Sequence, residues 1–144
     1  MAAVQPIEQP TSRSFETEFA TPDTTVQECA RKMRQTHVGA LPVEDNGKLI
    51  GIVTDRDICC RAVGEGRDPA TMAAREIMTG DVSSCLPDQD CAEAARLMKE
   101  NHLRRLVVKD RKHKVVGLLS VDDLARYSHE LAGAILEIAA PWPH

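Results

Sequence analysis

The sequence predicts a mixed α/β (α+β) fold built from two copies of a β-α-β-β-α unit. Three observations predict it: an internal repeat, an amphipathic helix pattern in each copy, and two short apolar runs after each helix. The repeat consists of identical residues at an offset of 65 and, after a gap of one residue, of 66. The identical pairs include Pro22 and Pro87, Glu28 and Glu93, Met33 and Met98, His37 and His102, Leu41 and Leu106, Gly51 and Gly117, and Asp57 and Asp123. The chain is therefore a tandem duplication.

Each copy is expected to begin with a short strand, around residues 17–21 and 82–86, followed by a helix. Thr25 and Asp90 each precede a glutamate by three positions, which is the spacing of a helix capping box. Apolar residues then recur at i, i+3, i+4 and i+7, which predicts one buried stripe on each helix. The stripes consist of Val26, Cys29, Ala30 and Met33 in the first copy, and Cys91, Ala94, Ala95 and Met98 in the second.

Two apolar runs follow each helix and are joined by a polar turn, which predicts a hairpin in each copy. The runs are residues 40–43 and 49–53 in the first copy, and 103–108 and 115–119 in the second. A further helix is expected to open at Thr54 and at Ser120. The helix after Ser120 carries apolar residues through Tyr127, Leu131 and Ile135, so we expect it to continue to about Ala140.

These elements divide the chain into five segments. Residues 1–14 are polar and contain prolines, and are expected to be a flexible N-terminal arm. The first repeat covers residues 15–66, and residues 67–79 form a connector with a short helix around 73–78. The second repeat covers residues 80–130, and residues 131–144 form a C-terminal helix extension and tail.

Composition excludes several classes of protein. With 18 basic and 22 acidic residues, the formal net charge is −4, and the chain lacks the positive field of a nucleic-acid binder. Aromatic residues make up 3%, too few for stacking on single-stranded bases. No apolar run reaches the roughly 20 residues of a membrane span, and the N-terminus does not read as a signal peptide. Five cysteines without a CxxC pair then indicate free thiols and a cytoplasmic protein.

The junction between the second apolar run and the last helix carries the candidate chemistry. It reads Gly51-Ile-Val-Thr54-Asp-Arg-Asp57 in the first copy and Gly117-Leu-Leu-Ser120-Val-Asp-Asp123 in the second. A hydroxyl at the helix start and a carboxylate one turn later lie on the same face. Such a carboxylate can accept both hydrogen bonds of a ribose diol, and the helix start suits a phosphate. The same spacing also describes plain helix capping, but its recurrence in both copies favours a binding site.

Two β-α-β-β-α copies that each contain this junction resemble a tandem pair of cystathionine-β-synthase (CBS) domains, over roughly residues 15–130. The chain is similar to small stand-alone bacterial CBS-pair proteins of the hypoxic response protein type. The resemblance implies a Bateman module: two repeats related by a pseudo-two-fold axis, with sheets packed together and helices outside. It also implies clefts between the repeats for adenosine-containing ligands (AMP, ADP, ATP, S-adenosylmethionine or NAD), and a homodimer.

The resemblance assigns roles to particular residues. Asp57 and Asp123 would bind ribose, with the hydroxyls of Thr54 and Ser120 near ribose or phosphate. The clefts would be lined by Ala20, Thr21, His37, Gly39, Ala40, Ser84, Cys85 and His102. Arg56, Arg104 and Arg105 are the candidate partners of phosphate groups. Because Arg104 and Arg105 replace Gly39 and Ala40, and Asp122 replaces Arg56, we expect two unequal sites.

These residues favour a non-catalytic regulatory module that senses an adenosine-containing ligand and signals to a protein effector in trans. Two alternatives remain open. One is a ligand-free dimerisation or interaction module with vestigial clefts. The other is an enzyme, metal protein or redox sensor that uses Cys59, Cys60 and the histidines; no nucleophile-base pair, metal-site pattern or catalytic cofactor motif supports it. For His37 and His102, a role at the helix end is favoured over a ligand or metal contact.

Overall fold

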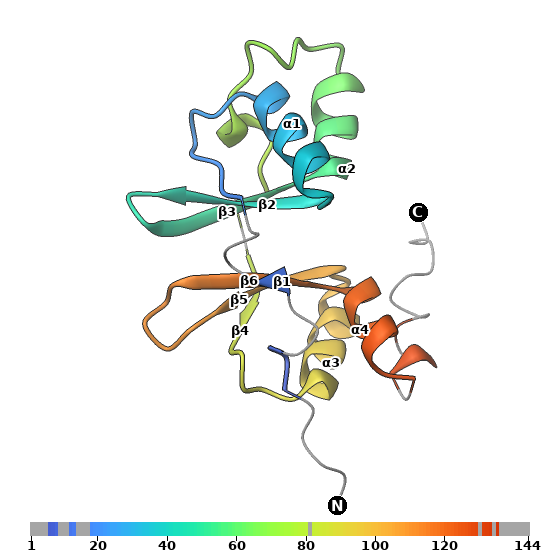
Figure 1. Ribbon diagram of the computed structural model, residues 1–144. Coiled ribbons are helices and arrows are strands. Elements are labelled where there is room, and N and C mark those ends of the chain that lie inside the picture. The colour runs from blue at the N-terminus through green and yellow to red at the C-terminus, as the bar shows by residue number, and fades with distance from the viewer. Residues whose placement is uncertain are drawn as a thin grey trace, which may run out of the picture. The chain divides into compact units, whose positions relative to one another are not determined.

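The computed structural model describes residues 6–8, 12–13, 18–80, 82–129, 131–133 and 135 (Figure 1). It divides into two compact units. The first-repeat unit spans residues 15–82, and the second-repeat unit combines residues 83–144 with the N-terminal segment 1–14. The fold class predicted from the repeat is confirmed, because each unit holds one short sheet with helices packed against it. None of the described helices is long and apolar enough to cross a membrane.

The first-repeat unit contains helix α1 (Val26–Thr36), which begins and ends where its sequence predicts. The hydroxyl of Thr25 accepts a hydrogen bond from the Glu28 N–H at 3.1 Å, so Thr25 caps the first turn. His37 ends the helix in the left-handed conformation, with φ of 57°. Val26, Cys29 and Met33 are buried as expected, whereas Ala30 is exposed at the edge of the stripe.

Strands β2 (Ala40–Asp45) and β3 (Lys48–Thr54) form the predicted hairpin, with Ala40 opposite Thr54. Asn46 and Gly47 both have positive φ, as a two-residue hairpin turn requires. On the outer edge of β3, Ile52 and Thr79 exchange two backbone hydrogen bonds of 2.9 Å. Gly51 permits this approach, because a Cβ there would lie 2.7 Å from Met78 Sδ and 2.9 Å from the Thr79 carbonyl oxygen.

Helix α2 (Asp55–Asp57) follows β3 and continues directly into the π-helix η2 (Ile58–Val63). The short helix expected around 73–78 is a single 3₁₀ turn, η3 (Ala74–Glu76). The core of this unit is aliphatic, in keeping with the low aromatic content. It comprises Ala20, Val26, Cys29, Met33, Leu41, Val43, Val53, Ala62, Met72, Ala74 and Ile77.

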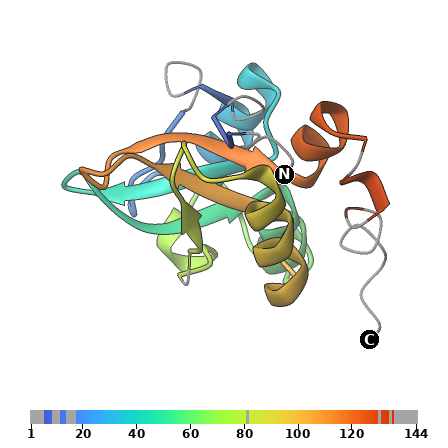
Figure 2. The ribbon, with the colours of Figure 1, turned by 90° about the horizontal axis from the view of Figure 1, so that it is seen from below.

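The second-repeat unit is built on a four-stranded sheet of order β1-β6-β5-β4. Its strands are β1 (Ser12–Arg13), β4 (Ser84–Cys85), β5 (Arg105–Lys109) and β6 (Val115–Ser120). Only the β4–β5 pair is parallel. Helices α3 (Cys91–Asn101) and α4 (Val121–Tyr127) lie on one face of this sheet (Figure 1). The hairpin turn and α4 lie at opposite ends of β6 (Figure 2).

The described parts of the N-terminal segment belong to the second-repeat unit, so the expectation of a flexible arm is wrong for them. Ile7 is fully buried in the core of this unit, and its N–H donates to the Gln89 carbonyl at 2.8 Å. Strand β1 pairs with β6, with Ser12 opposite Leu118. The physical reason is an open sheet edge: β1 satisfies backbone groups of β6 that would otherwise lack a strand partner.

The last helix does not run unbroken from Ser120 to Ala140 as expected. Helix α4 ends at Tyr127, and Ser128 has extended backbone angles. Tyr127 is 39% exposed, whereas Ile135 is buried at 3% and Leu131 packs against the same core. The break at Ser128 lets the chain turn back onto its own unit, which buries Ile135. Ile138 and the rest of the expected helix and tail, residues 136–144, lie outside the described residues.

Candidate ligand-binding site

The first-repeat junction is a reciprocal pair of hydrogen bonds between Thr54 and Asp57. The Thr54 hydroxyl accepts from the Asp57 N–H at 3.1 Å, and the Asp57 carboxylate accepts from the Thr54 N–H at 2.9 Å. This is a complete capping box at the start of α2. Asp57 is 7% exposed, so the box fixes a buried carboxylate at the end of β3.

The second repeat builds the same junction from Ser120 and Asp123. The two hydrogen bonds are again 3.1 Å and 2.9 Å long. The backbone matches as well, because Ser120 has φ of −106° and ψ of 164° while Thr54 has φ of −109° and ψ of 163°. The sequence repeat is therefore also a repeat of local geometry.

Each junction lies beside the first residues of the neighbouring strand. The Asp55 N–H donates to the Gly39 carbonyl at 2.9 Å, and the Val121 N–H donates to the Arg104 carbonyl at 3.0 Å. The register places Ala40 opposite Thr54 and Arg105 opposite Ser120. Of the residues predicted for the site, the structure thus brings together Gly39, Ala40, Thr54 and Asp57 in one unit, and Arg104, Arg105, Ser120 and Asp123 in the other.

One contact of the first junction was missed from the sequence. Arg61 Nη1 lies 3.5 Å from the second carboxylate oxygen of Asp57, and it also donates to the Ile77 carbonyl at 2.8 Å. The i to i+4 spacing on a helix was the available signal. The matching position in the second repeat is Tyr127, and among the described residues the Asp123 carboxylate has no basic partner. The two junctions therefore differ in charge.

Ala20, Thr21, Ser84 and Cys85 lie farther from the junctions. Ala20 pairs with Val43, three residues along β2 from Ala40, and Cys85 pairs with Val108, three residues along β5 from Arg105. At the rise of a strand, three residues correspond to about 10 Å. The sequence did not reveal the parallel register that sets these positions.

Cys85 is also unsuited to contact a ligand. Its side chain is 5% exposed and its thiol donates to the Val107 carbonyl at 3.8 Å. Burial raises the pKa of the Cys85 thiol to about 12, so the thiol stays protonated at neutral pH. Cys85 is a core residue of the second-repeat unit.

The histidines predicted near the site end the first helix of each repeat. His37 and His102 have φ of 57° and 53°, and each backbone N–H bonds a carbonyl of the last helical turn. Both side chains are exposed.

Arg56, in the first turn of α2, and Arg104 are exposed too, so a ligand can approach them. Across the described residues, no group of three or more His, Cys, Asp or Glu side chains could hold a metal ion.

A family model of the CBS domain matches residues 15–63 and 74–130, which contain both junctions. The chain belongs to the CBS-domain family. This CBS pair is 40% identical over 117 residues to the CBS domain-containing protein YhcV of Bacillus subtilis, covering 80% of the chain and 82% of YhcV. It is 31% identical over 120 residues to hypoxic response protein 1 of Mycobacterium tuberculosis, covering 81% of the chain and 83% of that relative.

Solved structures of other CBS-domain proteins match this CBS pair and confirm its fold class. A CBS-domain protein of Thermoplasma acidophilum matches with a TM-score of 0.83 and 26% identity, covering 95% of this chain and 75% of the other. CBSX2, solved in complex with AMP, matches with a TM-score of 0.71 and 22% identity, covering 88% of this chain and 98% of the other. At that identity, the second likeness shows the fold alone.

Proposed function

We propose that this CBS pair is a non-catalytic regulatory module that binds an adenosine-containing ligand at its two junctions. The observation that carries the proposal is the pair of matching capping boxes, Thr54 with Asp57 and Ser120 with Asp123. Each box holds one carboxylate oxygen against a backbone N–H, which orients the other oxygen before a ligand arrives. A preoriented carboxylate suits the two hydroxyls of a ribose.

The candidate ligands are AMP, ADP, ATP, S-adenosylmethionine and NAD. CBSX2 was solved with AMP, and the CBS-domain pair of protein MJ0100 with 5′-methylthioadenosine and S-adenosylmethionine. These complexes support an adenosine moiety as the shared chemistry. Exposed Arg56 and Arg104 would receive phosphate groups, with Arg105 beside the second junction.

The two junctions are proposed to bind unequally. Asp57 shares its carboxylate with Arg61, whereas Asp123 is more exposed and has the negative Asp122 beside it. A ligand at either junction can shift the conformation of the module only if it binds one conformation more tightly than another. The signal would pass to a protein effector in trans, from a homodimer in the cytoplasm.

Thermal unfolding with each ligand tests the proposal, using the double variant Asp57→Asn/Asp123→Asn. A ligand at a hundred times its dissociation constant adds about 2.7 kcal/mol of stability, a shift of several degrees in Tm. The shift should disappear in the double variant and persist in Asp45→Asn, which removes one negative charge from an exposed hairpin turn. No shift with any of the five ligands would overturn the proposal.

That negative outcome would favour the second candidate, a ligand-free interaction module. One observation supports this alternative: the Asp57 carboxylate is already satisfied within its own unit by Thr54 and Arg61. The function of the module would then be to form an oligomer. Light scattering on the wild type and on the double variant measures the oligomeric state.

A further inference from the structure

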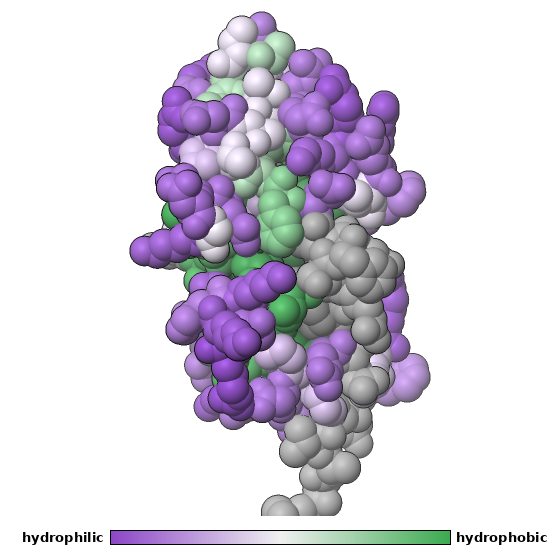
Figure 3. Space-filling model, turned by 60° about the vertical axis from the view of Figure 1, so that its left-hand side comes forward, coloured by the Kyte–Doolittle hydropathy of each residue, from purple (hydrophilic) through white to green (hydrophobic). Residues whose placement is uncertain are grey.

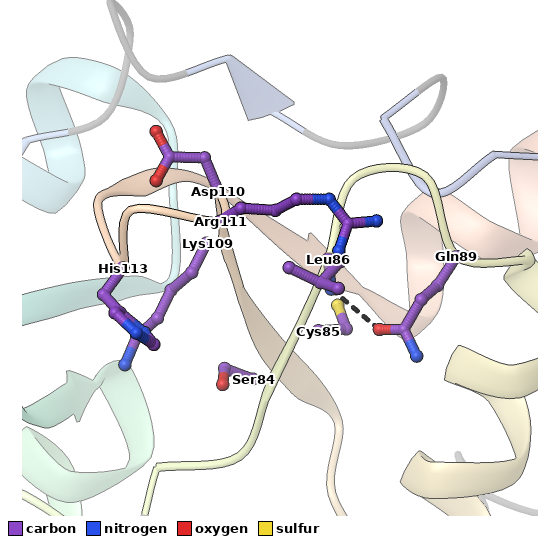
Figure 4. A pocket seen from close by; sticks show the side chains of 8 residues that line it. All are labelled: Ser84, Cys85, Leu86, Gln89, Lys109, Asp110, Arg111 and His113. Carbon is purple, nitrogen blue, oxygen red and sulfur yellow. Dashed lines mark hydrogen bonds between the residues drawn. The ribbon is translucent and has the colours of Figure 1, made fainter.

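A hollow of about 350 Å³ lies on the second-repeat unit, at the turn end of the β5–β6 hairpin (Figure 4). Its lining comes from β4 and the turn after it, and from the hairpin turn. The lining residues are Ser84, Cys85, Leu86, Gln89, Lys109, Asp110, Arg111 and His113. Lys109 is opposite Val115 at this end of the hairpin, whereas Arg105 is opposite Ser120 at the other. The two ends are four residues apart, about 13 Å, so this hollow is distinct from the Ser120–Asp123 junction.

The hairpin turn beside the hollow is strongly basic. It reads Lys109-Asp-Arg-Lys-His-Lys114, with four full positive charges and one negative charge. The negatively charged residue, Asp110, stabilises the turn. Its carboxylate accepts hydrogen bonds from the N–H groups of Lys112 at 2.8 Å and Lys114 at 2.9 Å. These backbone hydrogen bonds also hold the pKa of the Asp110 carboxyl below its ordinary value. The surface over this part of the unit is hydrophilic (Figure 3).

Hydrogen-bond donors in the hollow are left without partners. Figure 4 shows the Lys109 and His113 side chains running to the side of Ser84, while the Asp110 carboxylate points the other way. Within the part of the chain that the structure describes, the Lys109 ammonium, the His113 ring and the Ser84 hydroxyl have no hydrogen-bond partner.

The opposite wall of the hollow is held in place. Gln89 accepts from the Leu86 N–H at 2.7 Å and donates to the Glu93 carboxylate at 3.2 Å. Arg111 pairs with Asp88 at 2.7 Å, but both side chains are more than half exposed. An exposed ion pair of this kind is weak, so an anion in the hollow can compete for the Arg111 guanidinium.

The basic turn is not a requirement of the fold. The equivalent turn of the first repeat reads Glu44-Asp-Asn-Gly-Lys48, with two negative charges and one positive charge. It also closes a hairpin, with a turn one residue shorter, and its register shift after Val43 matches the shift after Val108. The positive charge of the second turn therefore calls for an explanation other than hairpin formation.

We propose that this hollow binds a small phosphate-bearing anion, with Lys109 and the Ser84 hydroxyl as donors on one side and Arg111 on the other. The volume lies at the low end of the range for small-molecule sites, which suits a compact polyanion. Arg111 supplies the planar fork and Lys109 the point charge, a combination suited to two linked phosphate groups. This site is additional to the adenosine junctions and does not depend on them.

Isothermal titration calorimetry with inorganic pyrophosphate, at constant ionic strength, tests the proposal. The wild type should bind one equivalent saturably, and sodium sulfate at the same ionic strength should not reproduce the binding. Lys109→Gln and Arg111→Gln should each weaken binding about tenfold or more, the value of a charge-assisted hydrogen bond. Circular dichroism melting shows whether each variant stays folded.

Lys112→Gln is the matched control. It removes the same charge from the same turn, but Lys112 does not line the hollow, so binding should weaken by about twofold at most. If Lys109→Gln and Lys112→Gln weaken pyrophosphate binding equally, the binding reflects the general positive charge of the turn and not a site, and the proposal is overturned. Absence of saturable binding by the wild type would also overturn it. Asp57→Asn/Asp123→Asn should bind pyrophosphate normally, which separates this result from that of the adenosine proposal.

Discussion

Thr54 and Asp57 hydrogen-bond to each other in both directions, at 3.1 Å and 2.9 Å, and so do Ser120 and Asp123. These residues therefore stabilise their helices whether or not a ligand is bound. A change at either aspartate acts on stability as well as on binding, and the two effects have to be measured separately.

Thr54→Ala should lower the free energy of unfolding by about 1 kcal/mol, because the Asp57 N–H loses its acceptor. Asp57→Asn should cost less than Asp57→Ala, since the amide oxygen can still accept the Thr54 N–H. Urea denaturation measures all three values. Thr71→Ala, in an exposed turn, is the control; if it costs as much as Thr54→Ala, capping does not explain the loss.

Gly51→Ala should destabilise the protein by about 1–3 kcal/mol, because the new Cβ would overlap Met78 Sδ and the Thr79 carbonyl. The Ile52–Thr79 backbone pair would have to separate. Gly80→Ala is the matched control, since a Cβ there meets nothing within 4 Å. Thermal melts of both variants check the prediction, and similar Tm values would contradict it.

Ile7→Ala should cost about 2–5 kcal/mol, the usual value for truncating a fully buried isoleucine. A flexible arm would give no loss at this position. Val63→Ala, at a side chain that is 63% exposed, should change the free energy of unfolding little. Chemical denaturation of the two variants distinguishes a packed segment from a free one.

Two of the five thiols should react rapidly with a disulfide reagent in the native protein. Cys59 and Cys60 are exposed, whereas Cys29, Cys85 and Cys91 are buried. Burial raises the pKa of Cys29 and of Cys91 to about 11, which further suppresses the reactive thiolate. The absorbance of the thiolate that the reagent releases gives the number of rapidly reacting cysteines. The double variant Cys59→Ser/Cys60→Ser should have no rapidly reacting cysteine.

Stability should fall in alkaline solution for the same reason. The folded-state pKa of Cys29 and Cys85 lies above the ordinary value of 9.0, so the folded protein keeps protons that the unfolded chain releases. Their contribution is complete below about pH 9 and is lost as pH rises toward 11 and 12. Urea denaturation at several pH values should show a shallower alkaline decline in Cys85→Ala than in the wild type.

Local patterns predicted the repeated elements because their causes are local. Caps at Thr25 and Asp90, helix stripes and the Asn46-Gly47 turn act within a few residues, and the junctions Thr54–Asp57 and Ser120–Asp123 follow from them. The domain boundaries remain a prediction, as do the ligand-binding roles.

What could not be predicted depends on long-range pairing. Ala20 and Cys85 lie away from the junctions because of the parallel register of their strands. That register depends on the pairing of two strands, so the sequence of one strand does not determine it. The burial of Ile7 and the pairing of β1 with β6 join segments far apart in the chain. The break at Ser128 reflects a tertiary contact, the burial of Ile135, which outweighs a continuous helical pattern.

Strand β1 imposes an order on folding during synthesis. The first-repeat unit, residues 15–82, is continuous, so it can fold while later residues are still inside the ribosome. The sheet of the second-repeat unit cannot form completely until β6 leaves the ribosome. Strand β1 therefore stays unpaired until about a hundred further residues have been translated. Over that interval, chaperones and other nascent chains can contact the Ile7 side chain, which is fully buried in the folded protein.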